Sequence, residues 1–207
     1  MQKEETLTLT ELTLNDLSLE GDIDEADFLD RVDCLCSLGQ NVMISNYQEH
    51  YKLASYLSQF TRKRKLAIIL GFNNLVRIFD ESYYHNLDGG ILESFSRLFG
   101  SNVQLYVYPT LNQNDQVLTI KDFEPEPHLE HLFKYLVAND KVKNVSNAKS
   151  SKLHIISDKV VEKIRNNESG WEEDVPQKVV ELIKEHHMFD FPYEVPQDEE
   201  EDYLEVD

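Results

Sequence analysis

The stretch that decides the fold is LAIILGFNNLVRIFDESYYHNLDGGILESFSRLFGSNVQLYVYP, residues 66–109. The apolar runs at its two ends, 66–70 and 103–108, are typical of buried strands. The two amphipathic segments between them, 74–84 and 88–100, have the length and spacing of helices, and a glycine ends the second one. Strands that alternate with helices of this length predict right-handed βαβ units and a parallel sheet.

The same alternation begins upstream of this stretch. Residues 41–45, NVMIS, form another short apolar run, and an amphipathic segment at 48–60 separates it from the run at 66–70. The nearly continuous apolar character of these two runs predicts strands that are buried on both faces, as in sheets with helices on each side. We therefore expect an α/β protein with a Rossmann-like, three-layer parallel sheet.

The pattern loosens beyond Pro109, where we expect a more α-rich C-terminal region. Trp171 follows the polar loop 166–170 and is expected to anchor it. A division into two domains between Pro109 and Pro125 stays open at this point. The elements expected here are a short strand at 117–120, a helix at 127–137, a strand at 152–156, a helix ending at 165 and a helix between 176 and 187.

Two terminal segments flank the expected α/β domain, which we place at residues 25–190 and which begins with a helix at 25–38. Residues 1–24 are rich in leucine but slip out of strand periodicity, so they predict an extended arm on a partner surface, with an edge strand as the weaker interpretation. Residues 191–207 hold seven acidic and no basic residues from Gln197 onward, which indicates a disordered, solvated tail. We consider the arm and the tail as docking elements for a protein partner.

Composition and charge restrict the class of protein. The 207 residues carry a formal net charge of -19 at pH 7, which repels the phosphate backbone of nucleic acids. No apolar run approaches the ~20 residues of a membrane-spanning helix, and the first residues lack the features of a signal peptide. The two cysteines, Cys34 and Cys36, match no zinc-binding pattern and are expected to be free thiols in a reducing compartment. We therefore expect a cytoplasmic protein that binds neither nucleic acid nor membrane.

The sequence contains none of the common phosphate-binding or catalytic motifs of α/β proteins. The patterns G-x-G-x-x-G, G-x-x-x-x-G-K-[ST], G-x-S-x-G and H-E-x-x-H do not occur. No catalytic residue, cofactor or metal is therefore assigned, and the question of an enzymatic activity stays open.

A ligand-binding crevice is expected where the strands of an open parallel sheet end, because the loops that follow the strands converge there. Small and amide-bearing side chains at these ends can form hydrogen bonds with a ligand, although they also cap helices and make turns. The candidate ligand-binding residues are Ser45, Asn46, Gly71, Asn73, Asn74, Gly89, Gly90, Tyr108 and Thr110.

Three further features have a structural interpretation beside a functional one. Asp88 is expected to cap the helix that follows it, which would occupy the amides that could otherwise bind an anion. His128 and His131 have the spacing of two metal ligands on a helix, but histidines at a helix start usually lie half-exposed without a metal. The basic run TRKRK, residues 61–65, is expected to be a solvated link or a partner for acidic segments.

Six stretches carry a resemblance to a known family: LTLNDLSLEGDIDEADFLDRVD, GQNVMISNYQEHYKL, GGILESFSRLFG, LYVYPT, HLFKYLVAND and GWEEDVPQKVVELIKEHHMF. They resemble the C-terminal half of an uncharacterised bacterial family whose members carry the labels TonB-dependent receptor or nicotinate-nucleotide adenylyltransferase. Neither label fits these residues, because the chain starts without an export signal and has no H-x-G-H motif. The resemblance implies no catalytic residue. It implies that the family's N-terminal half is missing or is a separate partner, with the arm at 7–19 as the connection.

Two functional hypotheses from different classes follow. The first is a non-catalytic interaction or regulatory domain that docks a partner through the arm or the tail, which the absent motifs favour. The second is a nucleotide- or metabolite-binding domain, alone or within an enzyme, which the parallel sheet favours. A crevice lined by Asn46, Asn73, Asn74 and Tyr108 would support the second hypothesis, whereas a crevice filled by Phe72 would exclude a ligand there.

Overall fold

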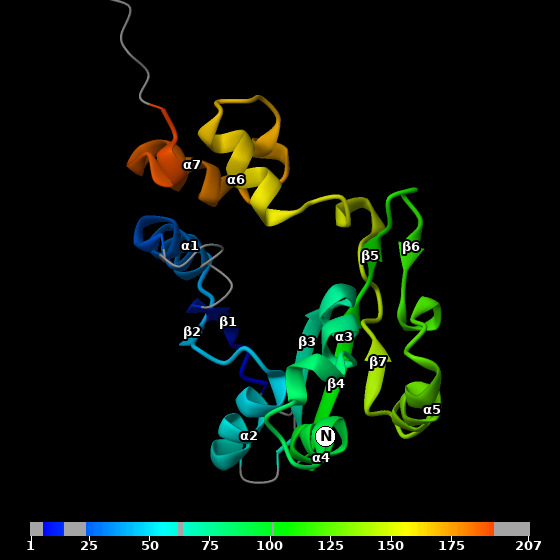
Figure 1. Cartoon of the computed structure of the whole chain (residues 1–207). Helices are drawn as coiled ribbons and strands as arrows, with labels where there is room; N and C mark the ends of the chain where they lie inside the picture. Colours follow the sequence, from blue (N-terminus) through cyan, green and yellow to red (C-terminus); the bar gives the residue numbers. More distant parts are fainter. Residues whose placement is uncertain (1–5, 15–23, 62–63, 101, 193–207) are drawn as a thin grey trace, which may run out of the picture. The chain divides into compact units, whose positions relative to one another are not determined.

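The computed structural model describes residues 6–14, 24–61, 64–100 and 102–192. These residues form two compact units (Figure 1). The α/β unit comprises Glu11–Ile23 and Met43–Ile156, and the helical unit comprises Met1–Thr10, Asp24–Val42 and Ser157–Asp207. The longer segment of the α/β unit, Met43–Ile156, therefore lies in the chain between the first helix of the helical unit and the two that complete it. The expected range 25–190 spans both units, and no boundary between the units falls between Pro109 and Pro125.

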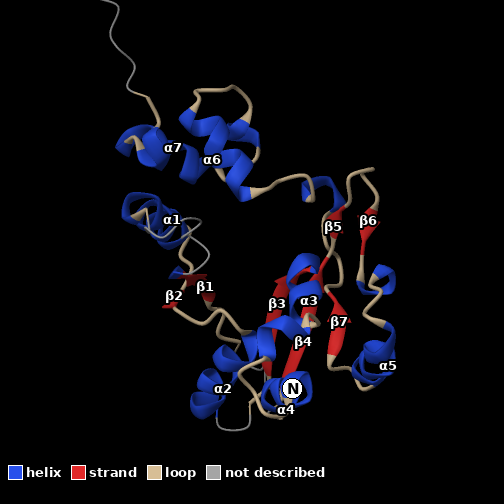
Figure 2. Ribbon diagram, viewed as in Figure 1, coloured by secondary structure: helices blue, strands red, loops and turns tan. Residues whose placement is uncertain are grey.

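The α/β unit contains a parallel sheet of three strands (Figure 2). They are β3 (Leu66–Gly71), β4 (Val103–Tyr108) and β7 (Val142–Asn144), in the spatial order β3-β4-β7. The register places Ile69 opposite Tyr106, and Tyr106 opposite Lys143. The Rossmann-like α/β class and the parallel sheet that the sequence predicts are confirmed.

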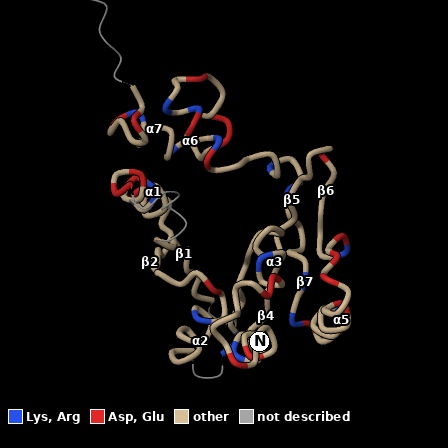
Figure 3. Tube along the Cα trace, in the orientation of Figure 1, with Lys and Arg blue, Asp and Glu red and all other residues tan. Residues whose placement is uncertain are grey.

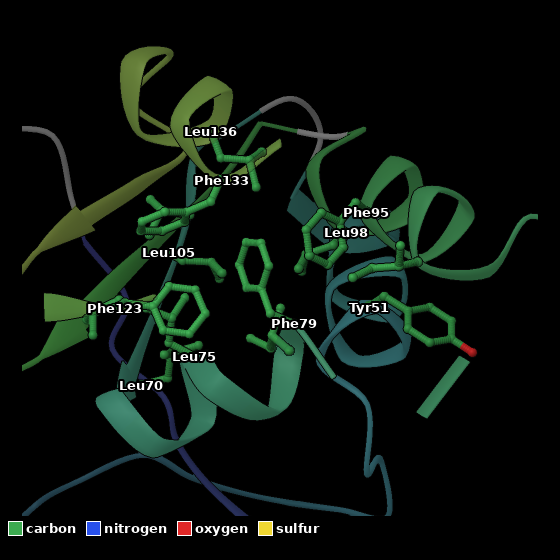
Figure 4. Packing of buried hydrophobic residues seen from close by; sticks show 14 of the residues in the cluster. Tyr51, Leu70, Leu75, Phe79, Phe95, Leu98, Leu105, Phe123, Phe133 and Leu136 are labelled. Atoms are coloured by element: carbon green, nitrogen blue, oxygen red, sulfur yellow. The ribbon is translucent and has the colours of Figure 1, made fainter. Parts of the chain in front are cut away.

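The helices of this unit follow from the amphipathic segments around the strands. Their buried side chains form one apolar cluster with the sheet, in which Val103, Leu105 and Val107 of β4 are completely buried. Phe79 lies at the centre of the cluster among Phe95, Phe123 and Phe133 (Figure 4). The helices are α2 (His50–Thr61), α3 (Phe72–Ile78), α4 (Gly90–Phe99) and α5 (Glu130–Ala138), with short 3-10 helices at Glu81–Tyr84, Ile120–Asp122 and Pro127–Leu129.

Helices cover one face of this sheet in the described part of the unit. Both crossovers, from β3 to β4 and from β4 to β7, step in the same direction, so right-handed connections place their helices on the same side. The side chains on the other face are accessible: Ile69 is 68% exposed and Tyr108 is 37% exposed. The expectation that strand 66–70 is buried on both faces is therefore wrong, and no described helix of the unit forms the third layer.

The apolar run at 41–45 forms a strand, but not in the parallel sheet. Strand β2 (Val42–Ser45) pairs with β1 (Thr10–Thr13) in a separate two-stranded sheet, and Ile44 is largely exposed. The amide of Thr10 donates a hydrogen bond to the carbonyl oxygen of Asn41 at 2.8 Å. The weaker interpretation of the arm, an edge strand, therefore describes Thr10–Thr13. Residues 1–5 and 15–23 lie outside the described residues.

The expected strand at 152–156 is also wrong. Ser150–Lys152 is a 3-10 turn followed by irregular backbone, and β7, which the sequence analysis missed, supplies the third strand of the sheet. The short strand expected at 117–120 is present as β6 (Val117–Leu118), which pairs antiparallel with β5 (Thr110–Leu111).

The helical unit contains α1 (Glu25–Ser37), α6 (Ser157–Arg165) and α7 (Gln177–His186), with 3-10 helices at Trp171–Glu173 and Met188–Asp190. Trp171, which follows the loop 166–170, is 1% exposed. Asp27 of α1 is buried and accepts a hydrogen bond from Nε of Arg31 at 2.5 Å, and Arg165 of α6 lies 3.4 Å away. No helix in the described part of the chain has the length and apolar character needed to cross a membrane. Of the tail at 191–207, residues 193–207 lie outside the described residues.

Candidate functional site

A cavity of about 300 Å³ lies at the carboxyl ends of β3 and β4. The position agrees with the general rule for ligand sites in open parallel sheets. The residues that line it come from the ends of the two strands, from the start of α3 and from the segment before α6. They are Gly71, Phe72, Asn73, Asn74, Tyr108, Pro109, Thr110, Lys152, Leu153, Ile155 and Ile156.

The cavity combines an apolar wall with several neutral polar groups. Asn73 and Asn74 bring side-chain amides, Tyr108 a phenol and Thr110 a hydroxyl. Phe72 lines the cavity too, but it is buried and its ring packs edge-on against Phe123, at 6.2 Å between centroids. These groups suit a small ligand that is recognised mainly by hydrogen bonds and apolar contact.

Five of the nine predicted ligand-binding residues therefore line one cavity: Gly71, Asn73, Asn74, Tyr108 and Thr110. Ser45 and Asn46 do not line it, because β2 pairs with β1 instead of joining the parallel sheet. The Ser45 hydroxyl instead donates a hydrogen bond to Oε1 of Glu11 at 2.5 Å. Ligand binding by the five residues stays a prediction.

Gly89 and Gly90, the other two predicted residues, begin α4 away from this cavity. The N-cap is Gly89 rather than Asp88, and the Gly89 amide donates to Oε2 of Glu93 at 2.9 Å. Glu93 also forms an ion pair with Arg97 at 2.5 Å. The protein's own carboxylate thus occupies the place where an anion would bind at this helix start.

The cavity also includes four residues that the sequence pattern does not identify as a ligand site: Lys152, Leu153, Ile155 and Ile156. Their apolar run was assigned to a strand, and such a run alone does not distinguish a strand from a cavity wall. Of the two histidines with metal-ligand spacing, His128 has its Nε2 2.6 Å from Oε2 of Glu81. The described residues contain no cluster of histidine, cysteine and acidic side chains that could hold a metal ion.

A second candidate site is the side of the sheet that no described helix of the α/β unit covers. We call it the open sheet face. It presents Ala67, Ile69, Gly71, Gln104, Tyr106, Tyr108 and Lys143, which alternate with the buried residues of the three strands. Strands β3 and β4 contain no charged residue (Figure 3), so the centre of this face is apolar and aromatic.

The polar side chains of β4 and β7 on the open sheet face form hydrogen bonds or ion pairs with neighbouring residues. Nε2 of Gln104 donates to the carbonyl oxygen of Asp140 at 3.1 Å, and Oε1 of Gln104 accepts from the Tyr106 hydroxyl at 3.3 Å. Nζ of Lys143 lies 3.1 Å from Oδ1 of Asp140. The part of the face with fewest polar groups is therefore around Ile69 on β3.

Strand β3 is also an edge of the sheet, since β4 is its one neighbour among the described strands. The Leu66 amide donates to the carbonyl oxygen of Asn102 at 2.9 Å, so Leu66 and alternate residues after it face β4. The amides of Ala67 and Ile69 then face the free side. We call this row of backbone groups the β3 edge. Edges of this kind pair readily with another extended chain.

Comparisons with protein-family models, with curated proteins and with solved structures found no match to this chain.

Proposed function

We propose that this chain is a non-catalytic interaction protein whose α/β unit docks a partner protein at the β3 edge and the open sheet face. The observation that carries the proposal is the exposure of Ile69, 68%, on an uncharged strand of a parallel sheet. Parallel sheets occur almost entirely with both faces covered, because their strands are apolar on both sides. A surface of this kind without a covering layer is typical of an interface whose partner is another chain.

The proposed docking element differs from the arm and the tail that the sequence suggested. Thr10–Thr13 of the arm already pairs with β2, whereas β3 has β4 as its one neighbour among the described strands. A partner that covers Ile69 would remove a large apolar side chain from water, which stabilises a complex by about 1.5–3 kcal/mol before the cost of association. Cys34 and Cys36 are both free thiols, which supports the cytoplasm as the compartment for this function.

The test compares two substitutions that each introduce a lysine at an exposed apolar residue, one on the open sheet face and one away from it. Ile69→Lys places a charge on the open sheet face, and Tyr135→Lys places one on α5, where Tyr135 is 62% exposed. Tagged wild-type and variant chains are purified from the cells that produce the protein, and the co-purifying proteins are quantified by mass spectrometry. We expect Tyr135→Lys to retain the partners of the wild type and Ile69→Lys to lose at least one of them.

Circular dichroism spectra check that both variants are folded. Exposed substitutions away from the core change the free energy of unfolding by about 0.5 kcal/mol or less. If the two folded variants recover the same proteins in the same amounts, the open sheet face is not the docking surface.

A second candidate function, binding of a small metabolite or nucleotide, is favoured by the convergence of Asn73, Asn74, Tyr108 and Thr110 on the cavity. A thermal-shift screen with ATP, NAD and a sugar phosphate tests it, because a ligand that binds the folded state raises the melting temperature. Thr110→Trp would fill the cavity and is expected to abolish any such rise. A rise that persists in the folded variant would place the ligand elsewhere.

A further inference from the structure

We infer that the partner segment is an extended acidic peptide that adds to the β3 edge as a new strand. The inference rests on the proposed docking function and names the chemistry of the partner. It follows from three observations: backbone groups of β3 that pair with no other described strand, an apolar side chain beside them, and two cations just before the strand that form no ion pair among the described residues.

The backbone groups provide the affinity. Ala67 and Gly71, the neighbours of Ile69 on the same face of the strand, are exposed as well. An added strand would form hydrogen bonds with the amides of Ala67 and Ile69 and extend the sheet, as in other complexes formed by strand addition. Such bonds do not depend on the sequence of the added chain, so the selection of a partner must come from side chains.

Side-chain alternation sets the first requirement. Every second residue of the added strand would face the open sheet face beside Ile69, which is apolar and uncharged. A β-branched residue packs well against such a neighbour on the same face. The partner segment therefore has apolar, β-branched residues at alternate positions.

Charge sets the second requirement. Arg64 and Lys65 directly precede β3, and both are exposed. Neither forms an ion pair with a carboxylate among the described residues, although acidic residues outnumber basic ones 39 to 20 in the whole sequence. Carboxylates at one end of the added strand would lie beside these two cations. This pairing of opposite charges also selects against apolar segments that lack charge.

A second copy of the chain fits this edge less well. Each copy carries a net charge of -19, so two copies repel one another. Pairing of β3 with β3 would also bring no carboxylate to Arg64 or Lys65, because β3 itself contains none.

The probes are fluorescently labelled synthetic peptides that alternate valine and threonine. One has a run of glutamates at its amino end and another has the run at its carboxyl end, since parallel and antiparallel addition place opposite ends beside Lys65. A third peptide has lysines in place of the glutamates. Fluorescence anisotropy with the full chain measures their dissociation constants at low and high salt. We expect one glutamate peptide to bind, more weakly at high salt, and the lysine peptide not to bind.

Two variants separate the contributions of charge and of the backbone, and a third is the control for net charge. Arg64→Glu with Lys65→Glu should weaken binding of the glutamate peptide about tenfold at low salt. Lys149→Glu with Lys159→Glu changes the net charge equally at two other exposed lysines and should leave binding unchanged. Ala67→Pro removes an amide from the β3 edge and should abolish binding. Proline is tolerated on an edge strand where the amide faces solvent, so this variant is expected to fold.

Failure of this inference is distinct from failure of the proposed function. If no glutamate peptide binds while Ile69→Lys still loses a partner, the open sheet face docks a partner of other chemistry and the inference is overturned. The inference is also overturned if Ala67→Pro binds the glutamate peptide like the wild type. Analytical ultracentrifugation provides the last check: a dimer that Ala67→Pro dissociates would assign the edge to a second copy.

Discussion

Replacement of Phe79 by alanine should remove a large part of the stability of the α/β unit. Phe79 is buried, and its ring centroid lies 5.1 Å from those of Phe95 and Phe123 and 5.5 Å from that of Phe133 (Figure 4). A buried Phe→Ala substitution costs about 3–5 kcal/mol, because it loses apolar contact and leaves a cavity. We expect about 4 kcal/mol for Phe79→Ala. Phe79→Leu keeps most of the volume but loses the three ring contacts, so we expect about 1–2 kcal/mol.

Urea unfolding followed by circular dichroism measures these losses. With a denaturant dependence of about 2 kcal/mol per molar urea, Phe79→Ala lowers the midpoint by about 2 M. Trp171, the one tryptophan of the sequence, lies in the helical unit, so its fluorescence reports on that unit alone. Tyr135→Ala is the control, because Tyr135 is exposed on α5 and its loss should change the free energy of unfolding by about 0.5 kcal/mol or less.

The result that refutes the reasoning is a small effect at the centre of the cluster. A loss below about 1 kcal/mol for Phe79→Ala, with an unchanged denaturant dependence, would mean that the four rings do not pack as described. If Tyr135→Ala lowers the free energy of unfolding as much as Phe79→Ala does, Tyr135 is not an exposed residue of α5 as described.

Three further predictions concern titration, thiol reactivity and a buried charge. Burial raises the pKa of Tyr84 to about 12 from 10.0, so the folded state keeps this proton more tightly and loses stability as the pH rises from about 10 toward 12. Tyr84→Phe should reduce that alkaline loss in urea titrations while costing about 1 kcal/mol at pH 7, because the Tyr84 hydroxyl donates to the carbonyl oxygen of Ile78 at 2.8 Å. Burial, with nearby carboxylates, raises the pKa of Cys34 to about 11, so iodoacetamide at pH 8 should modify the exposed Cys36 first. Mass spectrometry measures the two rates of modification, and equal rates would contradict this prediction. Asp27→Asn should lower the free energy of unfolding of the helical unit by about 1.5–3 kcal/mol, because it weakens the ion pairs of this buried carboxylate. Tryptophan fluorescence in urea measures the loss, and an unchanged midpoint would mean that the carboxylate does not stabilise α1.

The candidate site was predictable in part. Gly71, Asn73, Asn74, Tyr108 and Thr110 were placed at the ends of two neighbouring strands, and they do line one cavity. Their convergence follows from the parallel pairing of β3 with β4, which the βαβ pattern specifies locally. The wall formed by Leu153 and its neighbours could not be predicted in the same way, because a long connection brings it there and an apolar run does not encode its destination.

The pairing of β2 could not be predicted either, although its strand character could. Its run, VMIS, has the local character of a strand, and it is a strand. Its partner is Thr10–Thr13, more than twenty residues away in a different segment of the chain, and that choice removes Ser45 and Asn46 from the carboxyl edge of the parallel sheet. Strand periodicity depends on each segment alone, whereas pairing depends on contacts between segments that lie far apart in the sequence.

The strands β3 and β4, the helices around them and the α/β class follow from local patterns in the sequence. Contacts between distant segments place β3 at an edge among the described strands, add β7 to the sheet and put the described helices of the unit on one face. The physical reason is that apolar periodicity indicates which side chains are buried. It does not specify which strand lies beside them, because the same side chains can be buried against more than one neighbouring strand. In β3 the same apolar residues that indicate a buried strand leave Ile69 exposed, and this exposed residue is the basis of the proposed interface.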